Sequence, residues 1–262
     1  MGWFRRLLQT IAYVTIFPLS KFIPADAEPI GLAKYLPAVG ALIGMLLATC
    51  CIALQALSVP PLLSATIIVV LWLLVTGGLH FDGLMDTADG ICSHQNLERT
   101  LEIMHDPRVG NFAVIVGICT IALKIAALSA LITAVPEQMP LLLLLSPCFA
   151  RLVETWAIGN YKYARESGKG KAWHESTLFP QDFFWAAVIP LVLLLTAVFK
   201  GHSSTLLLLF IGLTAASGFA VGAYLDKILK GHTGDTYGAV VELSETLPLV
   251  AFALAVSGSF CG

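Results

Sequence analysis

Seven stretches of about 20 mostly apolar residues decide what this chain can fold into. A bilayer has a hydrocarbon core about 30 Å thick, and a helix of this length crosses it. Of the 262 residues, 57% are hydrophobic and only 12% are charged, whereas soluble domains carry about 25% charged residues. The sequence therefore predicts an all-α fold, a polytopic membrane helix bundle with about seven transmembrane helices that forms one integral membrane domain over residues 1–262. The expected spans lie near 36–57, 62–79, 112–135, 140–159, 183–200, 205–225 and 245–261.

The N-terminal segment RRLLQTIAYVTIF is less suited to crossing a bilayer than these spans. Gln9 and Thr10 interrupt its apolar character, and Pro18 ends it early. We expect an interfacial or re-entrant segment that lies near the membrane surface. Such a segment brings Arg5 and Arg6 to one membrane face.

Most of the positive charge falls on one side of the predicted bundle. The loops 80–111, 160–182 and 226–244 share that side with the N-terminal segment, and together they carry 12 of the 15 lysine and arginine residues. By the positive-inside rule, this side is cytoplasmic. Because every polar-rich loop opens on the same face, the pattern favours an active site facing the cytoplasm over a symmetric permeation path. The twelve residues are Arg5, Arg6, Lys21, Lys34, Arg99, Arg108, Lys162, Arg165, Lys169, Lys171, Lys227 and Lys230.

Charge and cysteine content exclude other classes of site. The formal net charge of -2 provides no extended basic surface, so no nucleic-acid partner is expected. The six cysteines form no CxxC pair and lie mostly within apolar runs. Neither a zinc site nor a disulfide framework is therefore indicated.

The motif GGLHFDGLMDTADG places three aspartates directly after an apolar span. If the chain stays helical beyond Leu79, Asp82, Asp86 and Asp89 lie at i, i+4 and i+7 and form one acidic stripe. A divalent cation relieves their repulsion, and an all-oxygen donor set suits Mg²⁺, or Mn²⁺, better than zinc. Gly83 is small enough for a phosphorylated ligand to approach the backbone. The alternative interpretation is a solvated helix end with no ligand.

Further candidates follow the stripe. Asp106 precedes a proline and predicts a turn back to the membrane, where Arg108 either binds a phosphate or anchors the chain at the membrane edge. Lys124 lies inside an apolar run, where an ammonium group needs a carboxylate, a phosphate or water. Glu154 is one conceivable partner, so the role of Lys124 stays open between substrate binding and a structural ion pair.

Two later segments and one histidine complete the set. Arg165 belongs to a cationic, glycine-containing loop suited to an anionic ligand. Asp235 either caps a helix or joins Glu242 in a second acidic wall of the site. His80 is a hydrogen-bonding residue by default, although it adjoins the acidic stripe.

Four motifs together carry a resemblance: TGGLHFDGLMDTADG, LEIMHDPRVG, YARESGKG and TGDTYGAVVELSE, in this order and at these intervals. Over nearly its whole length the chain resembles the cobalamin synthases, the adenosylcobinamide-GDP ribazoletransferase family. Members are Mg²⁺-dependent multi-pass enzymes of the bacterial inner membrane that complete the nucleotide loop of coenzyme B12. The resemblance implies that α-ribazole, or its 5′-phosphate, attacks adenosylcobinamide-GDP and releases GMP, leaving adenosylcobalamin or its 5′-phosphate.

That reaction is a phosphoryl transfer, which needs neutralised phosphate oxygens and a base for the attacking hydroxyl. Under the resemblance, the acidic stripe carries one or two Mg²⁺ ions, and Asp89 or Asp106 accepts the ribose proton. The expected partners are the two substrates and the lipid bilayer; a homo-oligomer or a complex with other cobalamin-pathway enzymes stays open. The predicted catalytic residues are Asp82, Asp86, Asp89 and Asp106, and the predicted substrate-binding residues are His80, Gly83, Arg108, Lys124, Arg165, Asp235 and Glu242.

Three rival functions are less well supported by the sequence. A membrane CDP-alcohol phosphotransferase acting on lipid has a related acidic motif, but here no Ala-Arg pair follows the glycine of ADG. An intramembrane prenyltransferase needs a second aspartate-rich motif, whereas this chain has only Asp235 and Glu242. A cation-coupled transporter is expected to show repeated halves, and no internal repeat is present in the sequence.

Overall fold

The helices of this protein follow its apolar segments closely in the computed structural model, which describes residues 2–23 and 29–258. Two short 3₁₀ turns, Ser20–Phe22 and Ala33–Tyr35, precede the second helix. The helices are α1 (Trp3–Val14), α2 (Leu36–Ala56), α3 (Pro61–Thr76), α4 (Leu79–Cys92), α5 (Leu97–Ile103), α6 (Asn111–Ala134), α7 (Met139–Asn160), α8 (Lys169–Ser176), α9 (Gln181–Phe199), α10 (Ser204–Leu229) and α11 (Gly234–Gly258).

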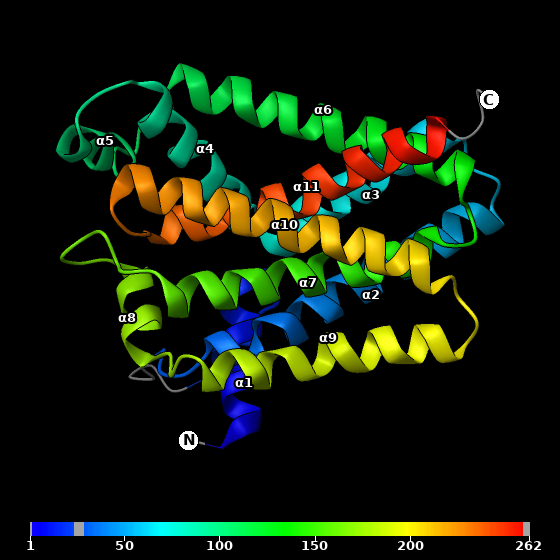
Figure 1. Ribbon diagram of the computed structural model, residues 1–262, viewed down its shortest axis with the longest axis horizontal. Helices are drawn as coiled ribbons and strands as arrows, with labels where there is room; N and C mark the ends of the chain where they lie inside the picture. The colour runs from blue at the N-terminus through cyan, green and yellow to red at the C-terminus, as the bar shows by residue number, and fades with distance from the viewer. Residues whose placement is uncertain (1, 24–28, 259–262) are drawn as a thin grey trace.

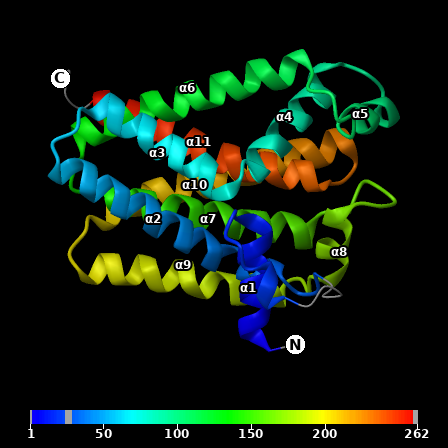
Figure 2. The same cartoon turned by 180° about the vertical axis from the view of Figure 1, so that it is seen from behind.

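Among the described residues, six helices are long and apolar enough to cross a membrane, and the bent pair of α3 and α4 raises this to seven if it counts as one span. Figure 1 shows the long helices running roughly side by side, with α7 and α11 in the interior, and Figure 2 gives the same bundle from behind. Helix α7 contacts α2, α9, α10 and α11. The prediction of an all-α membrane bundle is confirmed.

The last predicted span, 245–261, begins too late. Helix α11 already starts at Gly234, so most of the predicted loop 226–244 is helical, and residues 259–261 lie outside the described part of the chain. The sequence GDTYGAVVELSE looks like a loop because it is polar, but several of its polar side chains are buried within the bundle. Buried polar groups in a helix are stable when they find partners inside the protein.

Helices α2 and α7 pack closely because of two glycines four residues apart. A Cβ atom on Gly40 would lie 2.3 Å from the carbonyl oxygen of Pro147, and one on Gly44 would lie 2.4 Å from that of Leu144. Any larger residue there would push the two backbones apart. This small-residue spacing is the usual way in which membrane helices approach each other.

The acidic stripe sits on a helix that turns away from the span before it. Gly77 and Gly78 both adopt left-handed backbone angles, with φ of 59° and 70°, which glycine adopts at little cost. Helix α3 ends there, and α4 continues at an angle of 91° to it. The chain is helical through all three aspartates, as predicted, but only after this break.

Helix α1 crosses the bundle instead of running along it (Figures 1 and 2). Its 12 residues span about 18 Å at 1.5 Å per residue, too short for the hydrocarbon core. Trp3 and Phe4 are exposed, whereas Gln9 and Thr10 face the protein. This geometry agrees with the predicted interfacial segment.

Candidate active site

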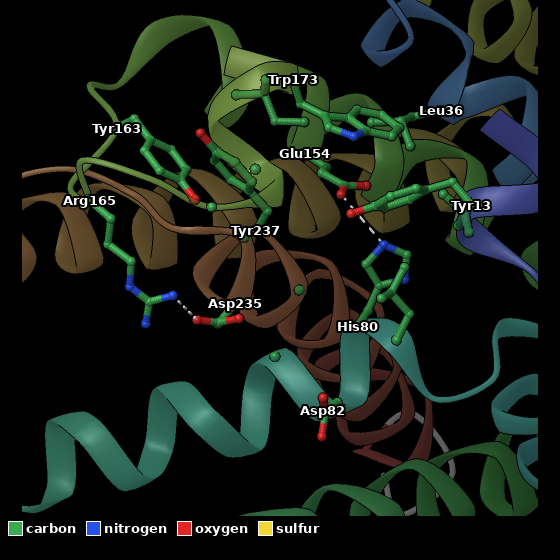
Figure 3. Close-up of a pocket in the computed structure, with 18 of the residues that line it drawn as sticks. Tyr13, Leu36, His80, Asp82, Glu154, Tyr163, Arg165, Trp173, Asp235 and Tyr237 are labelled. Carbon is green, nitrogen blue, oxygen red and sulfur yellow. Dashed lines mark ion pairs between the residues drawn. The ribbon is translucent and has the colours of Figure 1, made fainter. Parts of the chain in front are cut away.

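A pocket of about 370 Å³ lies where α4, α8, the end of α7 and the start of α11 meet, next to Tyr13 of α1. This volume falls in the usual range for small-molecule sites, roughly 300–1,000 Å³. In Figure 3 the pocket has two ends. Asp82, Asp235 and Arg165 lie at one end, and Glu154, Trp173 and Tyr13 lie at the other.

The first end is charged and mostly acidic. Arg165 approaches Asp235, with 2.9 Å between Nη1 and Oδ2, and it also donates from Nη2 to the carbonyl oxygen of Leu101. Asp86 lies in the repulsive field of Asp82, Asp235 and Asp89, and only Arg165 opposes this repulsion. The structure thus brings the predicted residues Asp82, Arg165 and Asp235 together in the pocket, and Asp86 lies near them without lining the cavity.

Gly83 has a different role from the predicted one. A Cβ atom there would lie 2.6 Å from the carbonyl oxygen of Asp235 and 3.0 Å from its Cα. Gly238 on α11 makes the reciprocal approach, because its Cβ would lie 2.7 Å from the carbonyl oxygen of His80. Gly83 does line the pocket. Its lack of a side chain, however, is explained by the close contact of α4 with α11, which sets Asp82 and Asp235 across the same space.

Asp89 points away from this end of the pocket. Its two carboxylate oxygens accept the backbone N–H groups of Gly110 and Ala113, at 2.6 and 2.8 Å. These are unpaired donors at the start of α6, where a carboxylate is favoured by the helix dipole. Asp89 therefore ties α4 to α6, and metal binding by it stays a prediction.

Asp106 and Arg108 pair with each other at the surface. Nη2 of Arg108 lies 2.6 Å from Oδ2 of Asp106, and the Arg108 side chain is 87% exposed. The hydrogen bonds from Arg108 hold the pKa of Asp106 well below its usual range. Neither residue lines the pocket, so the geometry does not support the predicted roles of Asp106 as a base and Arg108 as a phosphate ligand.

Lys124 forms a structural ion pair, and its partners are Glu242 and Glu245, not Glu154. Its Nζ lies 2.8 Å from Glu242 and 3.2 Å from Glu245, and 4.5 Å from the centre of the Trp72 ring. Arg151 pairs with Glu245 on the opposite side. Lys124, Glu242, Glu245 and Arg151, here called the buried network, are almost fully shielded from solvent. The predicted substrate contacts of Lys124 and Glu242 are therefore not supported.

His80 joins the buried network to the pocket. Nη2 of Arg151 lies 3.4 Å from His80 Nδ1, and His80 Nε2 lies 3.5 Å from Glu154 Oε1. Because a guanidinium can only donate, Nδ1 is the acceptor and Nε2 carries a proton towards Glu154. His80 is a hydrogen-bonding residue, as expected, and it orients a carboxylate that the sequence had not placed in the site.

The sequence did not identify Glu154, or the aromatic residues Trp173 and Tyr237, as parts of the site. Glu154 and Arg151 are the only charged residues of α7, and a charge inside a span is itself a functional signal. Trp173 and Tyr237 were not recognised because nothing in their local sequence sets them apart from other buried aromatic residues. Tyr237 is held by His232, whose ring stacks on it at 5.5 Å and on Tyr161 at 4.7 Å.

Tyr163 closes the pocket from the loop before α8. Its hydroxyl receives backbone hydrogen bonds from Gly234 and Lys171, and burial is the main cause of its raised pKa. The group therefore stays protonated at neutral pH. A Cβ atom on Gly170 would lie 3.0 Å from Gly234 Cα, so the starts of α8 and α11 meet backbone to backbone beside this ring.

A second, more open cavity of about 610 Å³ adjoins the first near the α3–α4 break. The two cavities share Tyr13, Leu79 and Asp82. The wall of the second one includes the apolar side chains of Ile16, Phe81 and Met85. Asp82 is thus accessible from two separate spaces.

The donor set suits a hard cation, although within residues 2–23 and 29–258 no three His, Cys, Asp or Glu side chains already converge as a metal-binding group. Asp82 and Asp86 lie one turn apart on α4, with Asp235 near both. Mg²⁺ is commonly bound by one or two carboxylates and otherwise by substrate phosphates and water. Asp82, which lines the pocket, and Asp86, one turn away from it, meet that requirement.

Comparison with known proteins identifies the family. The family model for cobalamin-5-phosphate synthase matches residues 6–253. A protein from Thermosynechococcus vestitus is 39% identical over 247 residues, covering 94% of each chain. One from Synechococcus sp. is 38% identical over 244 residues, covering 93% of this chain and 94% of its own length.

A third relative, from Acetivibrio thermocellus, is 34% identical over 257 residues, covering 97% of this chain and 99% of its own. All three are named adenosylcobinamide-GDP ribazoletransferase. No solved structure matches the chain. The length and level of these matches show that the chain belongs to the cobalamin-5-phosphate synthase family.

Proposed function

We propose that this protein is a Mg²⁺-dependent adenosylcobinamide-GDP ribazoletransferase. It joins α-ribazole, or its 5′-phosphate, to adenosylcobinamide-GDP and releases GMP. The ribose hydroxyl oxygen forms a bond to the phosphorus next to cobinamide, the bond from that phosphorus to the bridging oxygen breaks so that this oxygen leaves with GMP, and the hydroxyl proton is released to solvent. The names of the relatives support the reaction, and the arrangement of the pocket supports the way it is carried out.

The observation that carries the proposal is the position of Asp82 between two cavities. In a phosphoryl transfer, the attacking and leaving oxygens lie roughly in line on opposite sides of the phosphorus. An enzyme for this reaction must therefore hold two large groups that approach one point from different directions. The shared wall at Asp82 provides such a point.

The metal is proposed to sit against Asp82 and Asp86, with Asp235 facing them. When bound, Mg²⁺ neutralises charge on the diphosphate oxygens and on the departing GMP. The protein itself holds the phosphoryl donor, adenosylcobinamide-GDP. Arg165, fixed by its contact with Asp235, supplies the cationic side chain at this end, where a guanidinium binds phosphate oxygens in pairs.

The proposed membrane location and orientation follow from the distribution of positive charge among the loops. Helices α5 and α8 lie at one end of the bundle (Figure 1), and α8 contributes to the pocket. That end carries the cationic loops predicted to face the cytoplasm. We place the protein in a bacterial inner membrane with the pocket open to the cytoplasm, where a phosphorylated substrate would reach it.

The test is GMP release by detergent-purified protein supplied with adenosylcobinamide-GDP, α-ribazole and Mg²⁺. We expect GMP to appear only with both substrates, to stop on EDTA addition and to return with Mg²⁺ or Mn²⁺. The matched mock preparation is the same membrane extract without the protein. GMP formation without α-ribazole, or turnover that persists in EDTA, would contradict the proposal.

A further inference from the structure

The end of the pocket away from Asp235, together with Tyr237 between the two ends, holds three polar atoms that the protein leaves without partners. Within the described residues, Oε2 of Glu154, Nε1 of Trp173 and the hydroxyl of Tyr237 are buried and make no hydrogen bond. The three residues are 6%, 4% and 4% exposed, and all line the same cavity. Buried polar atoms nearly always have a partner, so this end is built to receive donors and acceptors from a ligand.

The orientation of Glu154 is fixed from behind. His80 presents its Nε2–H to Oε1 at 3.5 Å, and Arg151 holds the other ring nitrogen of His80. Oε1 is therefore directed at the protein, and Oε2 is left as an acceptor for the ligand. A carboxylate held in this way binds neighbouring N–H groups of a ligand more strongly than a neutral acceptor does.

The walls around these atoms suit a flat ring. Trp173 lies against Tyr13, with ring centres 5.0 Å apart, and Tyr237 is braced by its stacking on His232. Figure 3 shows the Trp173 and Tyr13 rings on the same side of the pocket as Glu154. Rigid aromatic walls bind planar rings by stacking and by excluding water.

We propose that this end binds the guanine of the GDP group in the donor substrate, with Glu154 as the residue that selects it. Guanine offers two adjacent donors, N1–H and the 2-amino group, to the free Oε2 of Glu154, and its O6 accepts from Trp173 Nε1–H. The diphosphate then extends towards Arg165 and Asp82. The inference rests on the proposed function and adds to it the place and the specificity of the leaving nucleotide.

The acceptor substrate fits this end poorly. The benzimidazole ring of α-ribazole carries no N–H once it is joined to ribose, so it leaves Glu154 Oε2 without a donor. Adenine presents a ring acceptor where guanine presents N1–H, and it would face the carboxylate with a lone pair. A site with buried polar groups rejects ligands that leave those groups unpaired.

The first test measures direct binding of GMP, IMP and AMP to the full-length protein in detergent with Mg²⁺. We expect GMP to bind most tightly, IMP to lose part of the affinity because it lacks the 2-amino group, and AMP to bind weakest. In Glu154→Gln, GMP affinity should fall about 10- to 100-fold, and the KM for α-ribazole should stay the same. The matched control is Glu137→Gln, an exposed residue between α6 and α7.

The second test uses the unpartnered donors. Because Trp173 Nε1 makes no hydrogen bond within the described structure, Trp173→Phe should weaken the binding of GMP and IMP, which both carry O6, and leave the binding of AMP, which lacks it, unchanged. A residue with only a structural role would weaken the binding of all three nucleotides alike. This variant also keeps the inference testable if Glu154→Gln fails to fold.

Two outcomes would overturn the inference: equal binding of GMP and AMP by the wild-type protein, or a Glu154→Gln variant that raises the KM for α-ribazole and leaves GMP affinity unchanged. The second result would assign this end to the acceptor. Failure of the proposed function is distinguishable, because it appears as absent GMP release by the wild-type protein, whereas nucleotide binding is measured without turnover.

Discussion

Helix α11 carries two groups of charged side chains that differ in how their charge is balanced. At its start, Asp235 meets Asp82, Asp86 and one arginine, Arg165. Two turns further on, Glu242 and Glu245 of the buried network meet Lys124 and Arg151. The buried network is neutral in formal charge, with two cations and two anions, whereas the group around Asp235 holds three carboxylates and one cation.

This difference separates structure from function within one helix. A neutral, dehydrated set of ions satisfies itself and is costly only when one member is removed. An acidic set beside a cavity is left with excess negative charge, which a bound cation and then a substrate can use. Charged residues inside a membrane protein are often all regarded as functional; here we expect the balance of charge to distinguish the functional group from the structural one.

The largest effect is expected at the unbalanced group. Asp82→Asn should lower kcat for GMP release by roughly a thousand-fold, since metal-assisted charge stabilisation contributes several kcal/mol. The melting temperature should stay the same or rise, because one of three mutually repelling charges is lost. Activity and thermal unfolding measured on the same preparation check this. An active Asp82→Asn enzyme, or one that unfolds early, would place Asp82 in the structural class.

The opposite result is expected in the buried network. Glu245→Ala removes the shared partner of Lys124 and Arg151 and should destabilise the fold by about 3 to 5 kcal/mol, because buried cations are left unpaired. Thermal unfolding in detergent measures this loss, with the exposed Glu102→Ala as the matched control. If Glu245→Ala melted like the wild type, the claim that this network is a structural unit would fail.

A pH effect is expected at His232, which lies just before α11. Burial lowers its pKa to about 4, below about 6.5 in an unfolded chain. The stability that the fold gains from keeping His232 neutral is therefore fully present above pH 6.5. As the pH falls towards 4, the free energy of unfolding decreases by on the order of 3 kcal/mol. Melting temperatures measured over this range should fall less steeply in His232→Gln. Parallel curves for the two proteins would show that another group causes the acid sensitivity.

The contact between α4 and α11 can be tested at Gly83. Gly83→Ala would place a methyl group 2.6 Å from the Asp235 carbonyl oxygen, so stability should fall by about 1 to 3 kcal/mol. GMP release should fall too, because Asp235 moves away from Asp82. The control is Gly212→Ala in α10, where a Cβ meets nothing within 4 Å and helix propensity favours alanine by up to about 1 kcal/mol.

The sequence predicted the membrane spans and part of the acidic group. It did not predict the partners of Lys124 or the contacts of Asp89, for specific reasons. The spans follow from hydropathy, and Asp82 and Asp86 follow from helical spacing. Lys124, however, finds its partners 118 and 121 positions away, and such distances carry no local signal. Asp89 looked equivalent to its neighbours, because a carboxylate that caps another helix is indistinguishable in sequence from one that binds metal.

The smallest effect on kcat/KM is expected at Arg108, one of the two arginines predicted to bind phosphate. Arg108 and Arg165 both lie in predicted cytoplasmic loops and were both candidates for binding phosphate. Arg108 is 87% exposed and paired with its neighbour Asp106, whereas the Arg165 side chain is 17% exposed and faces Asp235 in the pocket. An exposed ion pair contributes little, so Arg108→Gln should change kcat/KM by less than about twofold.

Arg165→Gln serves as the internal comparison and should lower kcat/KM by about 10- to 100-fold through weaker binding of the diphosphate. Steady-state kinetics with adenosylcobinamide-GDP as the varied substrate measures both variants. Equal losses in the two would mean that the Asp106–Arg108 turn closes over the substrate during turnover, and the distinction between a surface pair and a pocket pair would then not describe the working enzyme.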